Sequence, residues 1–289
     1  MTPAASVRWL EEAHLGPVSD NLRRVVTALL AAPVVLVLAY LGGWAFAAFV
    51  ALIGVLGQRE LYQMARQAGA QPHRTGGFVL GGLVVATVLR PTLWPLGAMV
   101  LLLFVVSAPL LLPQEDFLVS FTVTIAGIVY PTALLGSLVW LREVRSAAVT
   151  DDVAFRLVLF ALLVVWATDV AAYYVGRTIG RRPLAPTISP NKTWEGTLGG
   201  LGAALVIGLA LKLTLVDLLA WPHVAALVVI GGGISQLGDL LESTLKRSTD
   251  VDDSSQLLPG HGGMLDRFDA MAVAAPLIVL YLHLVAGLF

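Results

Sequence analysis

The chain has 289 residues, of which 13% are charged and 57% are hydrophobic, and its mean hydropathy is +0.84. Soluble domains carry about 25% charged residues, so this composition excludes an ordinary soluble protein and predicts an integral membrane protein. The net charge of -1 argues against a nucleic-acid binder, and the absence of cysteine excludes disulfides, Cys-ligated zinc, iron–sulfur clusters and thiol catalysis.

Residues 1–24 are predicted to be a polar N-terminal leader. They contain Glu11, Glu12 and Asp20 ahead of the first apolar run, a pattern unlike a secretory signal, so we expect the segment to stay attached. A short interfacial helix around Trp9 and Leu10 is the alternative.

Uncharged stretches predict the membrane spans, because a helix needs about 20 apolar residues to cross the hydrocarbon core. Residues 25–58 carry no charge over 34 residues, and Gly42 and Gly43 divide them into two spans. Further spans are predicted at 75–89, 91–114, 117–141, 155–175, 196–216, 218–238 and 270–289. The fold class is therefore predicted to be all-α, a polytopic membrane protein with about nine transmembrane helices.

We expect residues 25–154 to form the N-terminal transmembrane helices and residues 155–289 to form the C-terminal helices that carry the functional site. Basic residues mark cytoplasmic loops. The Arg and Lys residues within 59–74, 177–192 and 246–267 therefore predict that these three loops face the cytoplasm.

Charge concentrates in residues 239–269, where 10 of 31 residues are charged. At helical spacing, Ser235, Asp239, Ser243 and Lys246 fall on one face of a helix that leaves the eighth span. Such a polar face at a membrane helix end is costly unless it meets water, a cation or an anion. A solvated helix end with paired side chains is the alternative interpretation.

A loop with few side chains, Pro259-Gly260-His261-Gly262-Gly263, follows this helix. Such loops let backbone N–H groups approach a phosphate, although a flexible turn is the alternative. Asp266, Arg267 and Asp269 come next, and helix capping accounts for only one of the two acids. Carboxylates without thiols or paired histidines suit Mg²⁺ or Mn²⁺, so the pattern indicates metal-dependent phosphate chemistry.

Two further polar features lie upstream. Ser189, Lys192 and Thr193 open the seventh span, where unpaired backbone N–H groups favour an anion; an N-cap with a snorkelling Lys192 is the alternative. Asp169 lies within an apolar span and is a functional candidate, with a structural hydrogen bond to Tyr173 as the alternative.

Three stretches of the chain together resemble the phosphatidate cytidylyltransferase family, also called CDP-diacylglycerol synthases, over residues 160–275. These stretches are Trp166-Ala167-x-Asp169, Ser189-Pro190-x-Lys192-Thr193-x-Glu195-Gly196, and Ser243-x-x-Lys246-Arg247 followed by Asp253 and Pro259-Gly260-His261-Gly262-Gly263-x-x-Asp266-Arg267-x-Asp269.

This resemblance implies an enzyme that transfers a cytidylyl group from CTP to phosphatidic acid, giving CDP-diacylglycerol and diphosphate in phospholipid biosynthesis. It further implies Mg²⁺, with Mn²⁺ or a second cation left open. We also expect a homodimer in the bacterial inner membrane, with the active site facing the cytoplasm and no nucleic-acid partner. Another lipid phosphate as substrate, a transporter with Asp169 in an ion path, and a non-catalytic scaffold are the alternative hypotheses.

The resemblance also implies roles for individual residues. The expected metal ligands are Asp239, Asp266, Asp253 and Asp269. The expected catalytic residues, as contacts to phosphate groups, are Ser243, Lys246, Arg247, His261 and Arg267, where His261 either contacts phosphate or shapes the loop. The expected substrate-binding residues are Asp169, Ser189, Lys192, Thr193, Gly260, Gly262 and Gly263.

One position departs from the family pattern. Asp252 stands directly before Asp253, where the family usually has lysine. We hypothesise that this acid weakens CTP binding or recruits an additional divalent cation.

Overall fold

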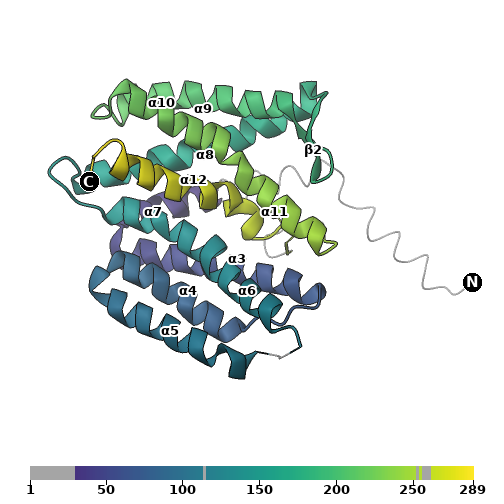
Figure 1. Cartoon of the computed structure of the whole chain (residues 1–289). Coiled ribbons are helices and arrows are strands. Elements are labelled where there is room, and N and C mark those ends of the chain that lie inside the picture. Colours follow the sequence, from purple (N-terminus) through teal and green to yellow (C-terminus); the bar gives the residue numbers. More distant parts are fainter. Residues whose placement is uncertain (1–29, 113–114, 252–253, 256–261) are drawn as a thin grey trace, which may run out of the picture.

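The structure is a computed structural model that describes residues 30–112, 115–251, 254–255 and 262–289, and helices make up most of these residues (Figure 1). The predicted leader, 1–24, lies outside the described residues. The helices are, in chain order, Leu30–Leu41, α3 (Gly43–Gln67), α4 (Arg74–Leu89), η2 (Pro91–Leu93), α5 (Trp94–Leu111), α6 (Phe117–Gly127), η3 (Ile128–Ala133), α7 (Leu134–Glu143), α8 (Asp151–Ile179), α9 (Trp194–Thr214), α10 (Trp221–Val229), η4 (Ile230–Ile234), α11 (Gln236–Ser248) and α12 (Leu265–Leu284).

Seven continuous helices among the described residues are long and apolar enough to cross a membrane, and two shorter apolar helices, Leu30–Leu41 and Arg74–Leu89, accompany them. The all-α polytopic membrane class is therefore confirmed, and the predicted number of about nine spans is approximate. The predicted break at Gly42 is also found, because helix Leu30–Leu41 ends there with Gly42 at a φ of 62°. Positive φ is a backbone conformation that glycine adopts without steric cost.

Several helices extend beyond the uncharged stretches that predicted them. The eighth span continues through η4 and α11 to Ser248 and so includes Asp239, Glu242 and Lys246. The last span begins at Leu265, five residues before the predicted start at Ala270. Charged residues at helix ends are compatible with a membrane helix where they meet water or one another.

The helices run back and forth between two ends of the bundle (Figure 1). At one end, which we call the site end, α3, α8 and α11 finish while α4, α9 and α12 begin. A two-stranded antiparallel sheet, β1 (Pro183–Ala185) and β2 (Ser189–Thr193), joins α8 to α9 at the same end. Helices close in space but distant in sequence thus bring their polar termini together there.

Helix α12 lies in the middle of the bundle, where it packs against α3, α7, α8 and α11 (Figure 1). Its buried face is rich in alanine, including Ala270, Ala272 and Ala274. Small residues allow helix backbones to approach closely in membrane proteins. Gly238 on α11 is such a contact, since a Cβ atom there would lie 2.2 Å from the carbonyl oxygen of Asp269.

Two segments, η3 and η4, are π-helical and interrupt otherwise continuous α-helices. The first contains Pro131, which has no N–H group to donate, and the second contains three consecutive glycines, Gly231–Gly233. A π-helical turn shifts the face on which the following side chains lie, and such turns are frequent near functional sites. The segment η3 precedes α7, which carries Arg142, and η4 precedes α11, which carries Asp239 and Glu242.

At the opposite end of the bundle, Arg142 of α7 connects helix Leu30–Leu41 to α8, and its side chain is only 2% exposed. The guanidinium Nε donates to the carbonyl oxygen of Ala39 at 2.6 Å, and Nη2 donates to that of Tyr40 at 2.8 Å. These are two of the last carbonyls of helix Leu30–Leu41, which have no partner within the helix. Arg142 also forms an ion pair of 2.8 Å with Asp151 at the start of α8.

Candidate functional site

Three acidic residues meet where α11 packs against α12. Asp239, Glu242 and Asp269 each place a carboxylate oxygen within 4.8 Å of the other two. Glu242 and Asp269 are only 2% and 4% exposed, and each has one oxygen that is buried without a hydrogen-bond partner. Buried carboxylates at this spacing repel one another unless a cation or proton joins them. The group therefore fits a hard divalent cation that binds oxygen ligands.

Lys246 lies beside this acid group on the same helix. Its ammonium Nζ forms ion pairs with Asp266 Oδ1 at 2.7 Å and with Glu242 Oε2 at 3.3 Å. Asp266 Oδ2 accepts hydrogen bonds from the Ser254 hydroxyl at 2.6 Å and from the Gly263 backbone N–H at 2.8 Å. Both oxygens of Asp266 thus have protein partners, which fix the start of α12 to the end of α11.

Glu60 connects α3 to the same region. Its side chain is buried, and its two oxygens accept four hydrogen bonds. Oε1 accepts from the Ser255 hydroxyl at 2.6 Å and the Met264 N–H at 2.9 Å. Oε2 accepts from the Leu265 N–H at 2.8 Å and, at 3.1 Å, shares the Ser254 hydroxyl proton with Asp266 Oδ2. A carboxylate on a helix N-terminus is a favourable arrangement. Glu60 thereby holds the first turn of α12 and both serines that follow α11.

A cavity of about 650 Å³ lies between the C-terminal part of α8, strand β2 and the first turns of α9 and α11. Within it, Lys192 of β2 and Asp239 of α11 form an ion pair of 2.7 Å. The cavity is lined by Asp169, Ala172, Tyr173, Gly176, Arg177, Ser189, Asn191, Lys192, Thr193, Gly196, Thr197, Gln236 and Asp239. It therefore has cationic, anionic and hydroxyl groups on its wall and reaches one member of the acid group.

The structure brings five of the predicted site residues around this cavity, namely Asp169, Ser189, Lys192, Thr193 and Asp239. The N-cap at the seventh span is also present, since the Thr193 hydroxyl accepts from the Gly196 N–H at 3.1 Å. Among the described residues no hydrogen bond joins Asp169 to Tyr173, whose hydroxyl accepts a hydrogen bond from Arg177 at 2.8 Å.

The other predicted site residues do not all lie around this cavity. Asp269 belongs to the acid group, whereas the described partners of Asp266 are Lys246, Ser254 and Gly263. Ser243 is half-buried on α11, Arg247 and Arg267 are exposed, and Gly262 has a φ of 75°. Asp253, Gly260 and His261 lie outside the described residues, as does Asp252.

The sequence analysis missed Glu60 as a site residue and did not propose Glu242 as a metal ligand. Glu60 did carry a signal, because it is the sole acidic residue between Asp20 and Glu115. Glu242 follows Asp239 by three residues, the spacing that puts two side chains on one helical face. Gln236 was also missed; its amide Nε2 donates to the carbonyl oxygens of Gly232 at 2.7 Å and Thr197 at 3.3 Å.

Taken together, these contacts place three clustered carboxylates beside Lys192 and Lys246 at one end of a membrane bundle. Such a set of groups can hold a divalent cation and neutralise phosphate oxygens at the same time. Phosphate groups that repel each other in water can therefore be brought together there.

Comparison with known proteins agrees with a site that binds phosphate groups. The model of the cytidylyltransferase family matches residues 22–285. The chain is 34% identical to the phosphatidate cytidylyltransferase of Brucella suis, over 91% of this chain and 93% of that protein. It is 34% identical to that of Bacillus subtilis, over 92% and 98% of the two chains. It is 32% identical to that of Synechocystis sp., over 91% and 96%.

Proposed function

Since this chain belongs to the cytidylyltransferase family, we propose that it is a phosphatidate cytidylyltransferase, which joins CTP to phosphatidic acid and releases diphosphate. The structural observation that best supports this function is the acid group of Asp239, Glu242 and Asp269, which lies between Lys192 and Lys246. Neither a different lipid phosphate nor a transporter or scaffold role is favoured by these observations.

In the proposed reaction, a phosphate oxygen of phosphatidic acid attacks the α-phosphorus of CTP. The new P–O bond gives CDP-diacylglycerol, and the bond from the α-phosphorus to the bridging oxygen breaks, so that diphosphate leaves with that oxygen. The attacking oxygen is already anionic near neutral pH, so no strong general base is required. The site must instead align and neutralise two anionic substrates.

Mg²⁺ is the proposed cofactor, and Asp239, Glu242 and Asp269 are the residues that would hold it, with Mn²⁺ or a second cation as open alternatives. When bound, such an ion neutralises charge on the nucleotide phosphates. Asp253 and Asp266 remain predicted ligands.

Lys192 and Lys246 point to the two sides of this acid group, through their ion pairs with Asp239 and Glu242. We assign them to phosphate oxygens, together with the hydroxyl of Ser189 in the cavity wall. Ser243, Arg247, His261 and Arg267 remain predicted phosphate contacts.

The distribution of basic residues supports an active site that faces the cytoplasm. The described cations near the site end are Arg59, Arg66, Arg74, Arg177, Arg181, Arg182, Lys192, Lys246, Arg247 and Arg267. Those near the opposite end are Arg90, Arg142, Arg145, Arg156 and Lys212. The excess at the site end fits the positive-inside rule, and CTP is a cytoplasmic solute. A bacterial inner-membrane location and a homodimer remain predictions.

The test is product formation by detergent-purified protein with labelled CTP, phosphatidic acid and Mg²⁺. We expect labelled CDP-diacylglycerol and equimolar diphosphate, and loss of both in Asp269→Asn. Folded protein that forms no CDP-lipid from phosphatidic acid would contradict the proposal, and product formed only from another lipid phosphate would change its substrate.

A further inference from the structure

A second cavity, of about 310 Å³, lies between α3, α6 and α11. Its walls are almost wholly apolar, with Leu61 from α3, Val119 and Val123 from α6, and Leu241 and Leu245 from α11. Val119 and Leu241 are also partly exposed on the outside of the bundle, at 54% and 43%. In a membrane protein such exposed apolar side chains contact lipid, so this cavity is continuous with a lipid-facing surface.

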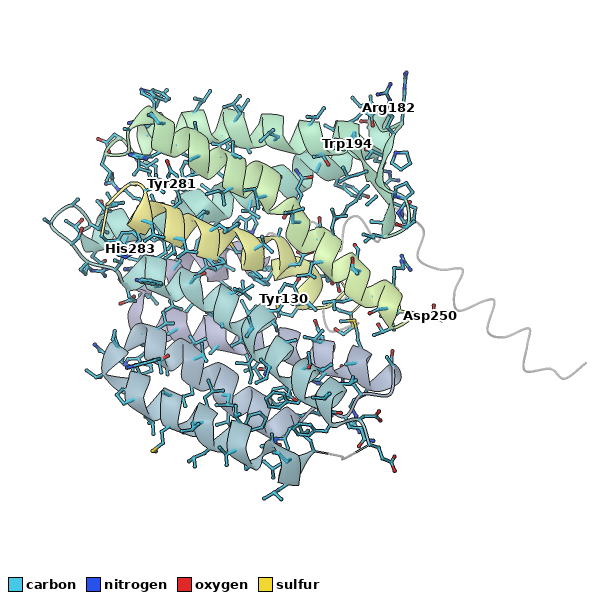
Figure 2. All side chains as sticks on the ribbon, in the orientation of Figure 1. Tyr130, Arg182, Trp194, Asp250, Tyr281 and His283 are labelled. Carbon is cyan, nitrogen blue, oxygen red and sulfur yellow. The ribbon has the colours of Figure 1, made fainter. Side chains whose placement is uncertain are left out.

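Tyr130 contributes a polar group to this cavity. The residue is 7% exposed, and its hydroxyl is buried without a hydrogen-bond partner among the described residues. A buried hydroxyl without a partner costs free energy, so one that persists beside a cavity points to a ligand. Figure 2 shows Tyr130 in the interior of the bundle, between the end with Asp250 and the end with Tyr281 and His283.

The cavity lies directly beside the acid group. Leu241, in its wall, precedes Glu242 on α11, so the two side chains point to adjacent sides of the same helix turn. The segment η3, which carries Tyr130, packs against α12, which carries Asp269. A molecule with a phosphate at the acid group therefore has an apolar space next to its phosphate, into which Tyr130 brings a hydroxyl, whereas the Ser248 and Thr249 hydroxyls in the wall already donate to backbone carbonyls.

Diacylglycerol phosphate has this order of groups, since its phosphate is followed by ester oxygens and then by alkyl chains. Apolar walls disfavour the polar ribose and triphosphate of CTP, and their burial there would leave polar groups unpaired. An alkyl chain, by contrast, gains free energy when it leaves a polar surface for apolar walls.

We propose that this cavity binds one acyl chain of the lipid substrate and that the Tyr130 hydroxyl donates a hydrogen bond to an ester oxygen of that lipid. The inference rests on the proposed function, and it identifies a lipid subsite formed mainly by α3 and α6 of the N-terminal half. Tyr130 is then a substrate-positioning residue, and a larger side chain at Ala126, which lines the cavity from α6, would occupy part of the space proposed for the acyl chain.

Kinetics of two variants test the inference. Tyr130→Phe should raise the KM for dipalmitoyl phosphatidic acid about threefold to tenfold, the range expected for one hydrogen bond, and leave the KM for CTP unchanged. Because the lost hydroxyl has no partner among the described residues, the melting temperature of the lipid-free protein should not fall. Ala126→Phe should raise the KM for the dipalmitoyl lipid about tenfold or more, because the larger side chain takes space from the long acyl chain. The KM for the shorter dioctanoyl lipid should rise by a smaller factor. Leu118→Phe, 74% exposed on the same helix and outside the cavity, is the matched control.

A second measurement does not depend on turnover. Phosphatidic acid with a photoreactive diazirine on one acyl chain should label peptides of α3, α6 or α11, and unlabelled phosphatidic acid should compete while phosphatidylcholine should not. Labelling elsewhere, or equal competition by both lipids, would overturn the inference. So would equal effects of Ala126→Phe and Leu118→Phe, or an effect of Tyr130→Phe on the KM for CTP alone. Inactivity of the unaltered enzyme would contradict the proposed function instead.

Discussion

The Glu60 carboxylate accepts a 2.8 Å hydrogen bond from the backbone N–H of Leu265, although 205 positions separate the two residues. This contact joins α3 to the first turn of α12 and, through Ser254, to Asp266 and Lys246. The N-terminal half of the chain therefore takes part in holding the site, beyond its packing role.

Glu60→Gln should reduce activity at least tenfold and lower the melting temperature in detergent. The glutamine amide replaces one accepting oxygen by an NH₂ group, which then faces donors and leaves two of the four hydrogen bonds unmade. Each hydrogen bond to a charged group contributes about 1.5–3 kcal/mol. Glu115→Gln, at an exposed acid before α6, is the control and should match the unaltered protein. Full activity of Glu60→Gln at unchanged stability would show that this contact is dispensable.

Gly263→Ala should inactivate the enzyme. A Cβ atom at this position would lie 2.0 Å from the Ser254 hydroxyl oxygen and 2.6 Å from Glu60 Oε2, so the hydrogen-bonded group would have to separate. Gly202→Ala is the matched control, because its Cβ would meet no atom within 4 Å on α9. It should keep full activity and, by helix propensity, gain up to about 1 kcal/mol in stability. Initial rates and melting curves of both variants measure this contrast.

Removal of divalent cations with EDTA should abolish activity, and added Mg²⁺ should restore it. Asp239→Asn should raise the Mg²⁺ concentration needed for half-maximal activity about tenfold or more, since it removes one charge from the acid group. Asp217→Asn, exposed near the opposite end of the bundle, should leave the Mg²⁺ titration unchanged. An Asp239→Asn enzyme with an unaltered titration would remove Asp239 from the metal site.

Arg142→Met should destabilise the protein without slowing the reaction. It leaves the carbonyl oxygens of Ala39 and Tyr40 without their donor, at a cost of about 3 kcal/mol. Arg156→Met removes an exposed pair with Asp152 one turn away and should cost about 0.5 kcal/mol or less. Melting temperature and turnover per folded molecule separate the two effects. A fall in turnover per folded molecule would mean that a change at the opposite end of the bundle alters the site.

Uncharged stretches located the helices well, because apolar length is a requirement that the bilayer places on each span separately. The charged helix ends were less predictable. Lys246 can lie in a continuation of the eighth span because Asp266 and Glu242 compensate its charge, and those partners come from the folded arrangement.

The burial of Ser235 was also not predicted. Ser235 and Asp239 were expected on one polar face, yet Ser235 is fully buried and its hydroxyl donates to the carbonyl oxygen of Gly231 at 2.7 Å. Helical periodicity gives the direction of a side chain around the helix axis, whereas its depth in the bundle depends on the neighbouring helices. Motif resemblance placed Asp169, Lys192 and Asp239 together correctly, because a shared motif carries three-dimensional information that periodicity lacks.

The ion pair between Lys192 and Asp239 keeps opposite charges in contact within the cavity. A cation that took the Asp239 carboxylate as a ligand would release the Lys192 ammonium, and an anion that took the ammonium would release the carboxylate. Each event therefore makes the other easier. An ion pair that arrives already formed, such as a nucleotide with its cation, exchanges partners with both residues at once and leaves no isolated charge at any stage. The resting Lys192–Asp239 pair thus has no net charge, like the nucleotide–cation pair that would replace it.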